Sequence, residues 1–596
     1  MVFKNLPIEI DKGGQARMRA VGVADPFGLE TAANAKLSDL HTRLLQEAAR
    51  NPHVHYFEVD PLTRASDRLV LRALIDFAEG QVLDVRVENT GYRGYELVLK
   101  DRAPSDAVTI ASRISGQGSG ANAIAAAEAL EMAYGVAPPP LATIVRGLGA
   151  AAELMASHTR HLSLVVGPDY SETIVKQTSP AIWTKASQAL AKGTAYHGFR
   201  TIGEIMEAMN PQSGMLYREG LHLTRAASEV AALIFGKYPH PSSIFPGGVG
   251  IEANRDTFHQ VLGRINRLVD YSKKAIAVWD DLVDFFYVAD RRYRQVGETQ
   301  ANLISSGLWD DPATYDAKFE HCNEWGEQRL STPGVAVQGK LRTTRLTEVS
   351  AGIEEFADRS YFSAWNGHPL KEDPRGVPLS PLHPWNKLTI PVPAPNDWQG
   401  NYSWNTAPRW DREPMETGPL ARQWVTAAAG KLKNEFIHAN GNGLEMNLPK
   451  FQLPAVKMTW DIPDHTNALE RNRARAYHIG YCSLVALTYL LKAFDCLQRG
   501  EKAMSNRFRL PQEAIGVGFW EDAQGCLMHY VMIASGHIAN YQIITASGWM
   551  SSPQDAFGVP GPYEQAMLAT PLLEEFNRPG NYTGIDLLRA VRSFDP

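Results

Sequence analysis

Two long segments with helical periodicity lie far apart in this chain, and they constrain its fold more than any other feature. Residues 256–293 have the pattern of one long helix or of two joined ones, and residues 471–499 that of a single long helix. A helix of that length buries its apolar stripe by packing against other long elements. We therefore expect distant parts of the chain to share one core, although a length of 596 residues would by itself favour several domains.

Shorter helical segments accompany these two. Ser119 is a candidate N-cap for a helix over residues 121–134, which Gly135 and the prolines at 138–140 end. Alanines dominate this helix, which indicates that neighbouring backbones approach it closely. Further helices are predicted over residues 141–164, from Pro180 towards residue 210, and over residues 420–439.

Short strands are predicted near both ends of the chain, over residues 54–59, 81–87, 95–100, 527–534 and 538–545. The sequence thus predicts an α+β protein that is mainly helical, with a long-helix core and small peripheral antiparallel sheets. We expect a single interwoven unit over residues 1–596. Its parts are a sheet-rich segment (1–110), a helical core (111–300), a loop-rich insertion (301–420), and C-terminal helices and strands (421–596).

The charge pattern excludes some classes of function. The chain has 59 basic and 65 acidic residues and a net charge of −6, with no basic stripe, so we expect no nucleic-acid partner. The N-terminus lacks the apolar segment of a signal peptide. No uncharged apolar stretch reaches the roughly 18 residues of a membrane span. We expect a cytoplasmic protein that reaches a membrane only through a partner.

The chain has four cysteines, Cys322, Cys482, Cys496 and Cys526. No two of them form a C-x-x-C pair, so the spacing indicates neither a disulfide framework nor a zinc or iron–sulfur ligand set. Cys482 and Cys496 lie fourteen positions apart in one predicted helix, at opposite ends of about four turns. We interpret all four as buried structural cysteines.

Four segments carry motifs of one known family in the same order and spacing. They are residues 239–250 (PHPSSIFPGGVG), 402–422 (YSWNTAPRWDREPMETGPLAR), 537–571 (HIANYQIITASGWMSSPQDAFGVPGPYEQAMLATP) and 587–596 (LLRAVRSFDP). Over almost its full length the chain is similar to the large subunit of [NiFe] hydrogenases. The resemblance implies the fold of that subunit and a small-subunit partner that carries iron–sulfur clusters.

The sequence departs from that family where the metal ligands belong. The family has an Arg-x-Cys-Gly-x-Cys-x-x-x-His motif, and here residues 113–122 read RISGQGSGAN. Ser115 and Gly118 stand at the cysteine positions and Asn122 at the histidine position. A hydroxyl oxygen is a hard ligand and glycine has no side chain, so neither replaces a bridging thiolate. We interpret these as vacated metal-site positions.

Two further departures concern the ends of the chain. Gly13 stands where the family has a glutamate that is thought to relay protons. The sequence ends at Asp595-Pro596, ahead of the Asp-Pro-Cys-x-x-Cys motif that supplies the family's second pair of thiolates. We therefore expect no metal and no other cofactor in this chain, and iron–sulfur clusters in its partner.

Polar residues surround the vacated positions. Arg113, Gln117, Ser119 and Arg409 are candidates for lining a cavity there. Arg409 matches an arginine beside the family's iron, and without iron it needs a carboxylate of the fold or a bound ligand as its partner. We favour the carboxylate. The cavity itself is either refilled by side chains and water or kept as a pocket for a small molecule.

Other residues in matched segments have no predicted ligand role. His158 and His161 lie three positions apart on a helix, and we interpret them as packed or as part of a proton network. Glu521 and His529 are expected to shape the core.

Three functions follow, in order of preference. The chain is a scaffold or electron-transfer subunit of a heteromeric complex. It pairs with an iron–sulfur small subunit, and this heterodimer either remains a heterodimer or assembles into a higher oligomer. Alternatively, it is a repurposed redox enzyme that binds another small molecule in the old cavity. A working nickel-dependent hydrogenase comes last, because so many ligand positions have changed.

Overall fold

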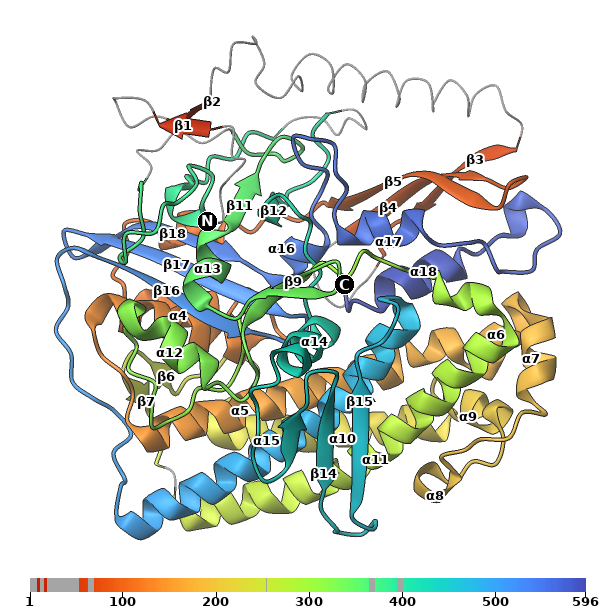
Figure 1. Cartoon of the computed structure of the whole chain (residues 1–596), viewed down its shortest axis with the longest axis horizontal. Helices are drawn as coiled ribbons and strands as arrows, with labels where there is room; N and C mark the ends of the chain where they lie inside the picture. Colours follow the sequence, from red (N-terminus) through yellow and green to blue (C-terminus); the bar gives the residue numbers. More distant parts are fainter. Residues whose placement is uncertain are drawn as a thin grey trace.

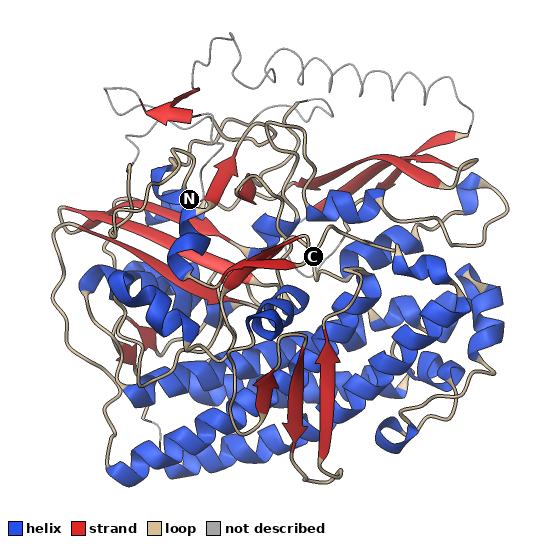
Figure 2. Cartoon of the chain, in the orientation of Figure 1, coloured by secondary structure: helices blue, strands red, loops and turns tan. Residues whose placement is uncertain are grey.

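Long helices from distant parts of the chain pack side by side and form the core. The computed structural model describes residues 8–10, 16–18, 53–62, 69–252, 254–363, 370–393 and 400–596. Helix α11 packs against α15, α15 against α5, and α5 against α10. These helices form a layer in the lower half of the view in Figures 1 and 2. Their bounds are α5 Pro140–Arg160, α10 Met215–Phe235, α11 Arg255–Ala289 and α15 Ala468–Arg499.

Side-chain caps set where the two longest helices begin. The side chain of Asn254 accepts a hydrogen bond from the backbone N–H of Thr257 at the start of α11, and Asn467 caps α15 in the same way. Helix α15 ends at Gly500, which adopts a φ of 78°. By length and composition alone α15 could cross a membrane, but 72% of its apolar window is buried within the protein. It is therefore a core helix.

Two three-stranded antiparallel sheets lie above these core helices in Figure 1. One contains β3 (Val54–Val59), β4 (Leu69–Asp76) and β5 (Gln81–Asn89) in sequence order. The other contains β16 (Ala514–Glu521), β17 (Cys526–Ala534) and β18 (His537–Ile544). The strands predicted over residues 54–59, 81–87, 527–534 and 538–545 are confirmed within one or two positions. β4 and β16 were not predicted.

Helix α4 (Ser119–Tyr134) packs on strand β16 at unusually short range. A Cβ atom on Gly518 would lie 1.8 Å from the backbone oxygen of Ala125, and one on Gly516 would lie 2.1 Å from that of Ala129. Glycine is thus required at these two positions of β16. The close approach that the alanine-rich sequence indicates is confirmed.

Smaller elements complete an α+β fold with small antiparallel sheets, as predicted. The remaining sheets are β1 (Ile8–Ile10) with β2 (Ala16–Met18); β8 (Leu303–Ser305) with β9 (Gly334–Val337) and β10 (Lys340–Thr343); β11 (Ile353–Phe356) with β12 (Ala407–Trp410); β13 (Ile437–Ala439) with β14 (Gly443–Leu448) and β15 (Val456–Asp461); and β6 (Ile244–Phe245) with β7 (Gly248–Val249).

Two local predictions were wrong because a glycine interrupts or precedes the element. Residues 95–100 do not form a strand, since Tyr95–Leu99 is the short helix α2, which begins after Gly94 with a φ of 61°. A five-residue apolar run does not distinguish a strand from a helical turn. The helix predicted over residues 420–439 ends earlier, as α14 (Pro419–Ala429), because Gly430 adopts a φ of 62°.

The single helix expected from Pro180 towards residue 210 was also wrong. The segment is divided into α7 (Pro180–Ala186), α8 (Thr194–His197) and α9 (Ile202–Ala208). Gly193 precedes α8 and Gly198, with a φ of 83°, follows it. Glycine lowers helix propensity at both breaks.

Candidate functional site

The loop over residues 113–118 joins α3 (Asp106–Ala111) to α4, and its own side chains hold its shape. The Ser115 hydroxyl accepts hydrogen bonds from the backbone N–H groups of Gln117 (3.2 Å) and Gly118 (3.0 Å). The Asn122 side-chain amide donates to the Gly118 carbonyl at 2.8 Å. The structure thus brings Ser115, Gly118 and Asn122 together. Gly13 lies outside the described residues.

The other sequence-predicted residues near this loop are arranged differently. Arg113 is exposed, and its carbonyl accepts a hydrogen bond from the Tyr95 hydroxyl at 2.7 Å. The Oε1 atom of Gln117 is buried and has no hydrogen-bond partner among the described residues. Ser119 is the first residue of α4 rather than its N-cap, which is Gly118. The Ser119 hydroxyl accepts from the His240 N–H at 3.0 Å and so fixes the loop that begins at cis-Pro239.

A carboxylate fills the space beside Gly118. A Cβ atom built on Gly118 would lie 2.9 Å from Cβ and 2.9 Å from Oδ2 of Asp522. Asp522 is held there by its turn, because its Oδ1 accepts from the N–H groups of Gln524 (2.8 Å) and Gly525 (2.9 Å). Burial raises the pKa of Asp522 to about 6. No side chain fits at position 118 unless Asp522 moves.

A second buried carboxylate caps the first turn of α4. Glu153 of α5 accepts hydrogen bonds from the N–H groups of Gly120 (2.8 Å) and Ala121 (2.9 Å), and from the Ser119 hydroxyl at 3.3 Å. A negative side chain is favoured at this end of a helix. Burial nevertheless raises the pKa of Glu153 to about 8.

Asp595 forms a third buried carboxylate at the same place. Its two oxygens lie 3.0 Å from Nδ1 of His161 and 3.2 Å from Nη1 of Arg475. Its carbonyl accepts from the Gln524 side chain at 2.7 Å, which joins it to the Asp522 turn. Burial would raise the pKa of Asp595, but His161 and Arg475 hold it below its usual range. Burial lowers the pKa of His161 to about 4.

From Arg475 a line of buried ring and guanidinium groups continues through the helices. Arg475 Nη1 lies 3.2 Å from His158 Nδ1, His158 Nε2 lies 3.0 Å from His478 Nδ1, and Arg422 Nη1 lies 3.2 Å from His478 Nε2. Arg422 in turn pairs with Glu521. Burial, and then the neighbouring positive groups, lower the pKa of both histidines far below the usual value. Both rings are therefore neutral.

His158 and His161, interpreted from the sequence as packed or as part of a proton network, are both buried and both contact polar groups. Cys482 joins the same group, because its sulfur lies 3.3 Å from His478 Nδ1. The ligand atoms of His158, His478 and Cys482 lie within 4.8 Å of one another, close enough to hold a metal ion. The guanidinium groups of Arg422 and Arg475 touch the same rings and repel a cation there. We therefore interpret the trio as a hydrogen-bonded part of the core.

Arg409 does not face an open cavity. Its five N–H donors reach Asp555 (2.9 Å), Ser552 (3.0 Å) and three backbone carbonyls. Both Arg409 and Asp555 are buried. A carboxylate of the fold is thus its partner, as favoured from the sequence.

Comparisons with known proteins agree with this architecture. The family model described as nickel-dependent hydrogenase matches residues 93–199 and 195–596. This chain therefore belongs to the nickel-dependent hydrogenase large-subunit family.

Two relatives and one solved structure illustrate how far the likeness extends. The uptake hydrogenase large subunit of Bradyrhizobium diazoefficiens is 27% identical, over 90% of this chain and 93% of that one. The solved actinobacterial-type NiFe-hydrogenase from Ralstonia eutropha H16 is 38% identical with a TM-score of 0.89, covering 91% of this chain and 99% of the other. The periplasmic [NiFeSe] hydrogenase large subunit of Desulfomicrobium baculatum is 26% identical, with the same coverage as the first.

Several residues of the site were missed from the sequence. His478 and Cys482 are four positions apart on one helix, a spacing that places them on one face and could have been noticed. Glu153, Asp522 and Arg475 carry no such signal. They reach the loop only through the packing of α5, the β16–β17 turn and α15.

Proposed function

We propose that this chain is a hydrogenase-type large subunit that holds no nickel–iron centre. It acts as a scaffold or electron-transfer component of a heteromeric complex. Its partner is a small subunit that carries iron–sulfur clusters, and the complex is cytoplasmic. The observation that carries the proposal is the Asp522 carboxylate beside Gly118, at one of the positions where the family has a thiolate.

The residues present do not fit the nickel–iron group of the family. That group needs thiolates from the loop over residues 113–118, and Ser115 offers a hydroxyl that is already used as the acceptor of two backbone N–H groups. Nickel with a bridged iron prefers soft sulfur ligands. All four cysteines are free and buried, and Cys482 alone joins the polar line described above.

The surrounding charges also support a structural role for this region. The three carboxylates at the loop are engaged by backbone N–H groups, by Arg475 or by His161. Such satisfied buried networks rigidify a core. The relatives named large subunits suggest what this rigid body does, namely bind a small subunit. A surface that was retained for that purpose would explain why the whole fold persists.

Metal analysis of the purified complex tests the proposal, together with infrared spectroscopy in the region of iron-bound CO and cyanide. We expect no nickel and no diatomic bands, with iron present only in proportion to a cluster-bearing subunit. An active [NiFe] hydrogenase prepared in the same way is the positive control. Stoichiometric nickel with those bands would overturn the proposal, and so would purification as a chain without any small subunit.

A further inference from the structure

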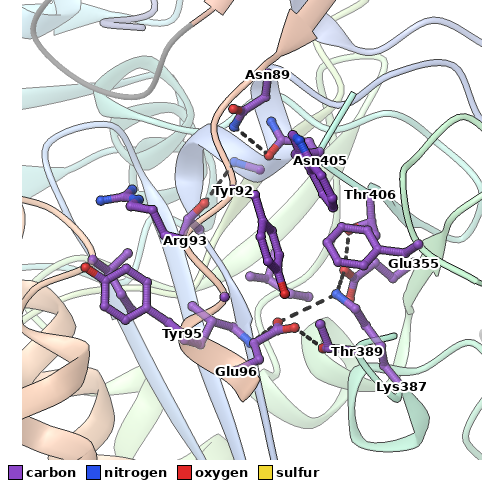
Figure 3. A pocket seen from close by; sticks show the side chains of 18 of the residues that line it. Asn89, Tyr92, Arg93, Tyr95, Glu96, Glu355, Lys387, Thr389, Asn405 and Thr406 are labelled. Carbon is purple, nitrogen blue, oxygen red and sulfur yellow. Dashed lines mark hydrogen bonds and ion pairs between the residues drawn. The ribbon is translucent and has the colours of Figure 1, made fainter. Parts of the chain in front are cut away.

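A separate cavity of about 160 Å³ lies beside the loop, between the segment after β5 and the strands β11 and β18. Figure 3 shows its polar side chains converging from segments far apart in the sequence. Glu96, Glu355, Lys387 and Thr389 lie together in one part of it, with the ring of Tyr92 above them. Ile114 also lines it, so the cavity adjoins the Ser115 loop without including it.

The cavity contains two carboxylates and one buried ammonium group. Lys387 Nζ contacts Glu355 Oε1 and lies 3.7 Å from Glu96 Oε1. Glu355 is 2% exposed, and its other oxygen, Oε2, has no hydrogen-bond partner among the described residues. A buried carboxylate oxygen without a donor is costly, typically by about 1–3 kcal/mol. The Glu355 carboxylate therefore brings unmatched negative charge to the wall of the cavity.

The charge balance favours a cation. Glu96 and Glu355 face a single ammonium group inside the cavity, so with both carboxyl groups ionised one negative charge is in excess. Arg93 also lines the cavity, but it is exposed, and its guanidinium lies 5.4 Å over the ring of Tyr95, on the opposite side of Tyr92 from Lys387 (Figure 3). Solvent screens a charge at that position.

Aromatic faces form the remaining wall. Tyr92 stacks on Trp404 with ring centroids 4.4 Å apart, and the Phe362 ring lies 5.7 Å from Trp404. Lys387 Nζ already lies 5.8 Å over the Phe362 ring. Aromatic faces attract ammonium groups through the ring quadrupole. The wall and the carboxylates thus select the same kind of ligand.

We propose that this cavity binds a small primary alkylammonium ion. The ammonium group of the ligand lies at the carboxylates of Glu96 and Glu355 and against the ring of Tyr92, and its alkyl part lies against Trp404 and Phe362. The proposal concerns a site next to the Ser115 loop and does not depend on whether the protein holds nickel.

Calorimetric titration of the full-length protein, with any subunit that co-purifies, tests this with three probes of one size. n-Butylammonium is expected to bind with a Kd of about 1 mM or lower, since five heavy atoms suffice for that affinity. n-Butanol, which lacks the charge, should bind at least about tenfold more weakly, and butyrate should not bind. Equal affinity for n-butanol, or no heat from n-butylammonium at ten times that concentration, would overturn the proposal.

Paired variants then test where the ligand lies. Glu355→Gln should weaken n-butylammonium binding by about tenfold or more, because it removes the excess charge. Glu354→Gln is the matched control, because Glu354 directly precedes Glu355 in β11 and does not line the cavity. Glu354 is also buried, and its Oε2 also has no hydrogen-bond partner among the described residues. Its affinity should equal that of the unchanged protein.

A second pair keeps the test decisive if Glu355→Gln fails to fold. Tyr92 is 39% exposed, so Tyr92→Leu should fold and should weaken binding by about threefold to tenfold through loss of the cation–π contact. Tyr56→Leu, at a tyrosine that is 54% exposed on β3, should leave binding unchanged. Unchanged binding in Tyr92→Leu, or equal losses in both members of either pair, would overturn the proposal.

Discussion

The Oδ2 atom of Asp522 lies 2.9 Å from the point that a Cβ atom of residue 118 would occupy. Gly118 has a φ of −102° and a ψ of 34°, a conformation with negative φ that does not itself demand glycine. The carboxylate, and not the backbone, therefore excludes a side chain at this position. The resemblance to [NiFe] hydrogenase large subunits implies a cysteine at this position, and here the Asp522 carboxylate fills the corresponding space.

Gly118→Ala should destabilise the protein by about 1–3 kcal/mol, because the added methyl group overpacks the contact with Asp522. Gly116→Ala is the control, since a Cβ atom there meets nothing within 4 Å and the change should be nearly neutral. Chemical denaturation measures both. In the background Asp522→Gly, the cost of Gly118→Ala should fall below its cost in the natural chain. An unchanged cost in that background would contradict the steric explanation.

Arg409→Met should destabilise the protein by about 3–5 kcal/mol, because it leaves the buried Asp555 carboxylate without its cation. Lys192→Met breaks an ion pair with Asp284 in which the lysine side chain is 79% exposed. That change should cost less than about 1 kcal/mol. Denaturant titration of the two variants compares them directly. Similar losses would show that Arg409 is not held as tightly as its five donors indicate.

The native protein should show no reactive thiol, and four should react after unfolding. All four cysteines are buried, and burial raises the pKa of each, that of Cys322 to about 12. A thiol that stays protonated neither attacks a disulfide reagent nor binds a metal as a thiolate. Leu190→Cys, at a position that is 80% exposed, provides a positive control that should react at once. Titration with a chromogenic disulfide counts the thiols, and rapid reaction of a native cysteine would argue against their structural role.

The long-helix core was predictable because its signal is local and repeated. Helices α11 and α15 were predicted to within a few residues, since each repeats the helical pattern over many turns. Errors arose in short segments such as Tyr95–Leu99, where one turn of apolar residues fits either a helix or a strand. Tertiary packing against β18 decides the outcome there.

The candidate site was predictable only in part. The positions Ser115, Gly118 and Asn122 follow from the motif, and the structure brings them together. Which groups fill the space around them could not be predicted, because Glu153 and Asp522 come from elements that carry no motif of their own. Arg409 was predictable in part. A buried guanidinium needs an oppositely charged partner, which the sequence argument could state, but only the fold shows that this partner is Asp555.

Glu153 should make the protein less stable as the pH rises from about 4.5 to about 8. Its pKa in the folded protein is raised to about 8 from an ordinary 4.5, so within this range the folded state holds a proton that the unfolded state has released. The stabilising contribution is complete below pH 4.5 and is lost as the pH passes through 8. Glu153→Gln cannot titrate, so its stability relative to the natural chain should rise with pH across this window. Thermal unfolding of both proteins in a pH series measures the difference in their stability. The contributions of the other titratable groups cancel in that difference.

Glu172→Gln is the control, because the Lys176 hydrogen bond lowers the pKa of Glu172. The difference in stability between Glu172→Gln and the natural chain should therefore stay flat above pH 4.5. A flat difference for Glu153→Gln as well would mean that the α4 cap is ionised like any surface carboxylate.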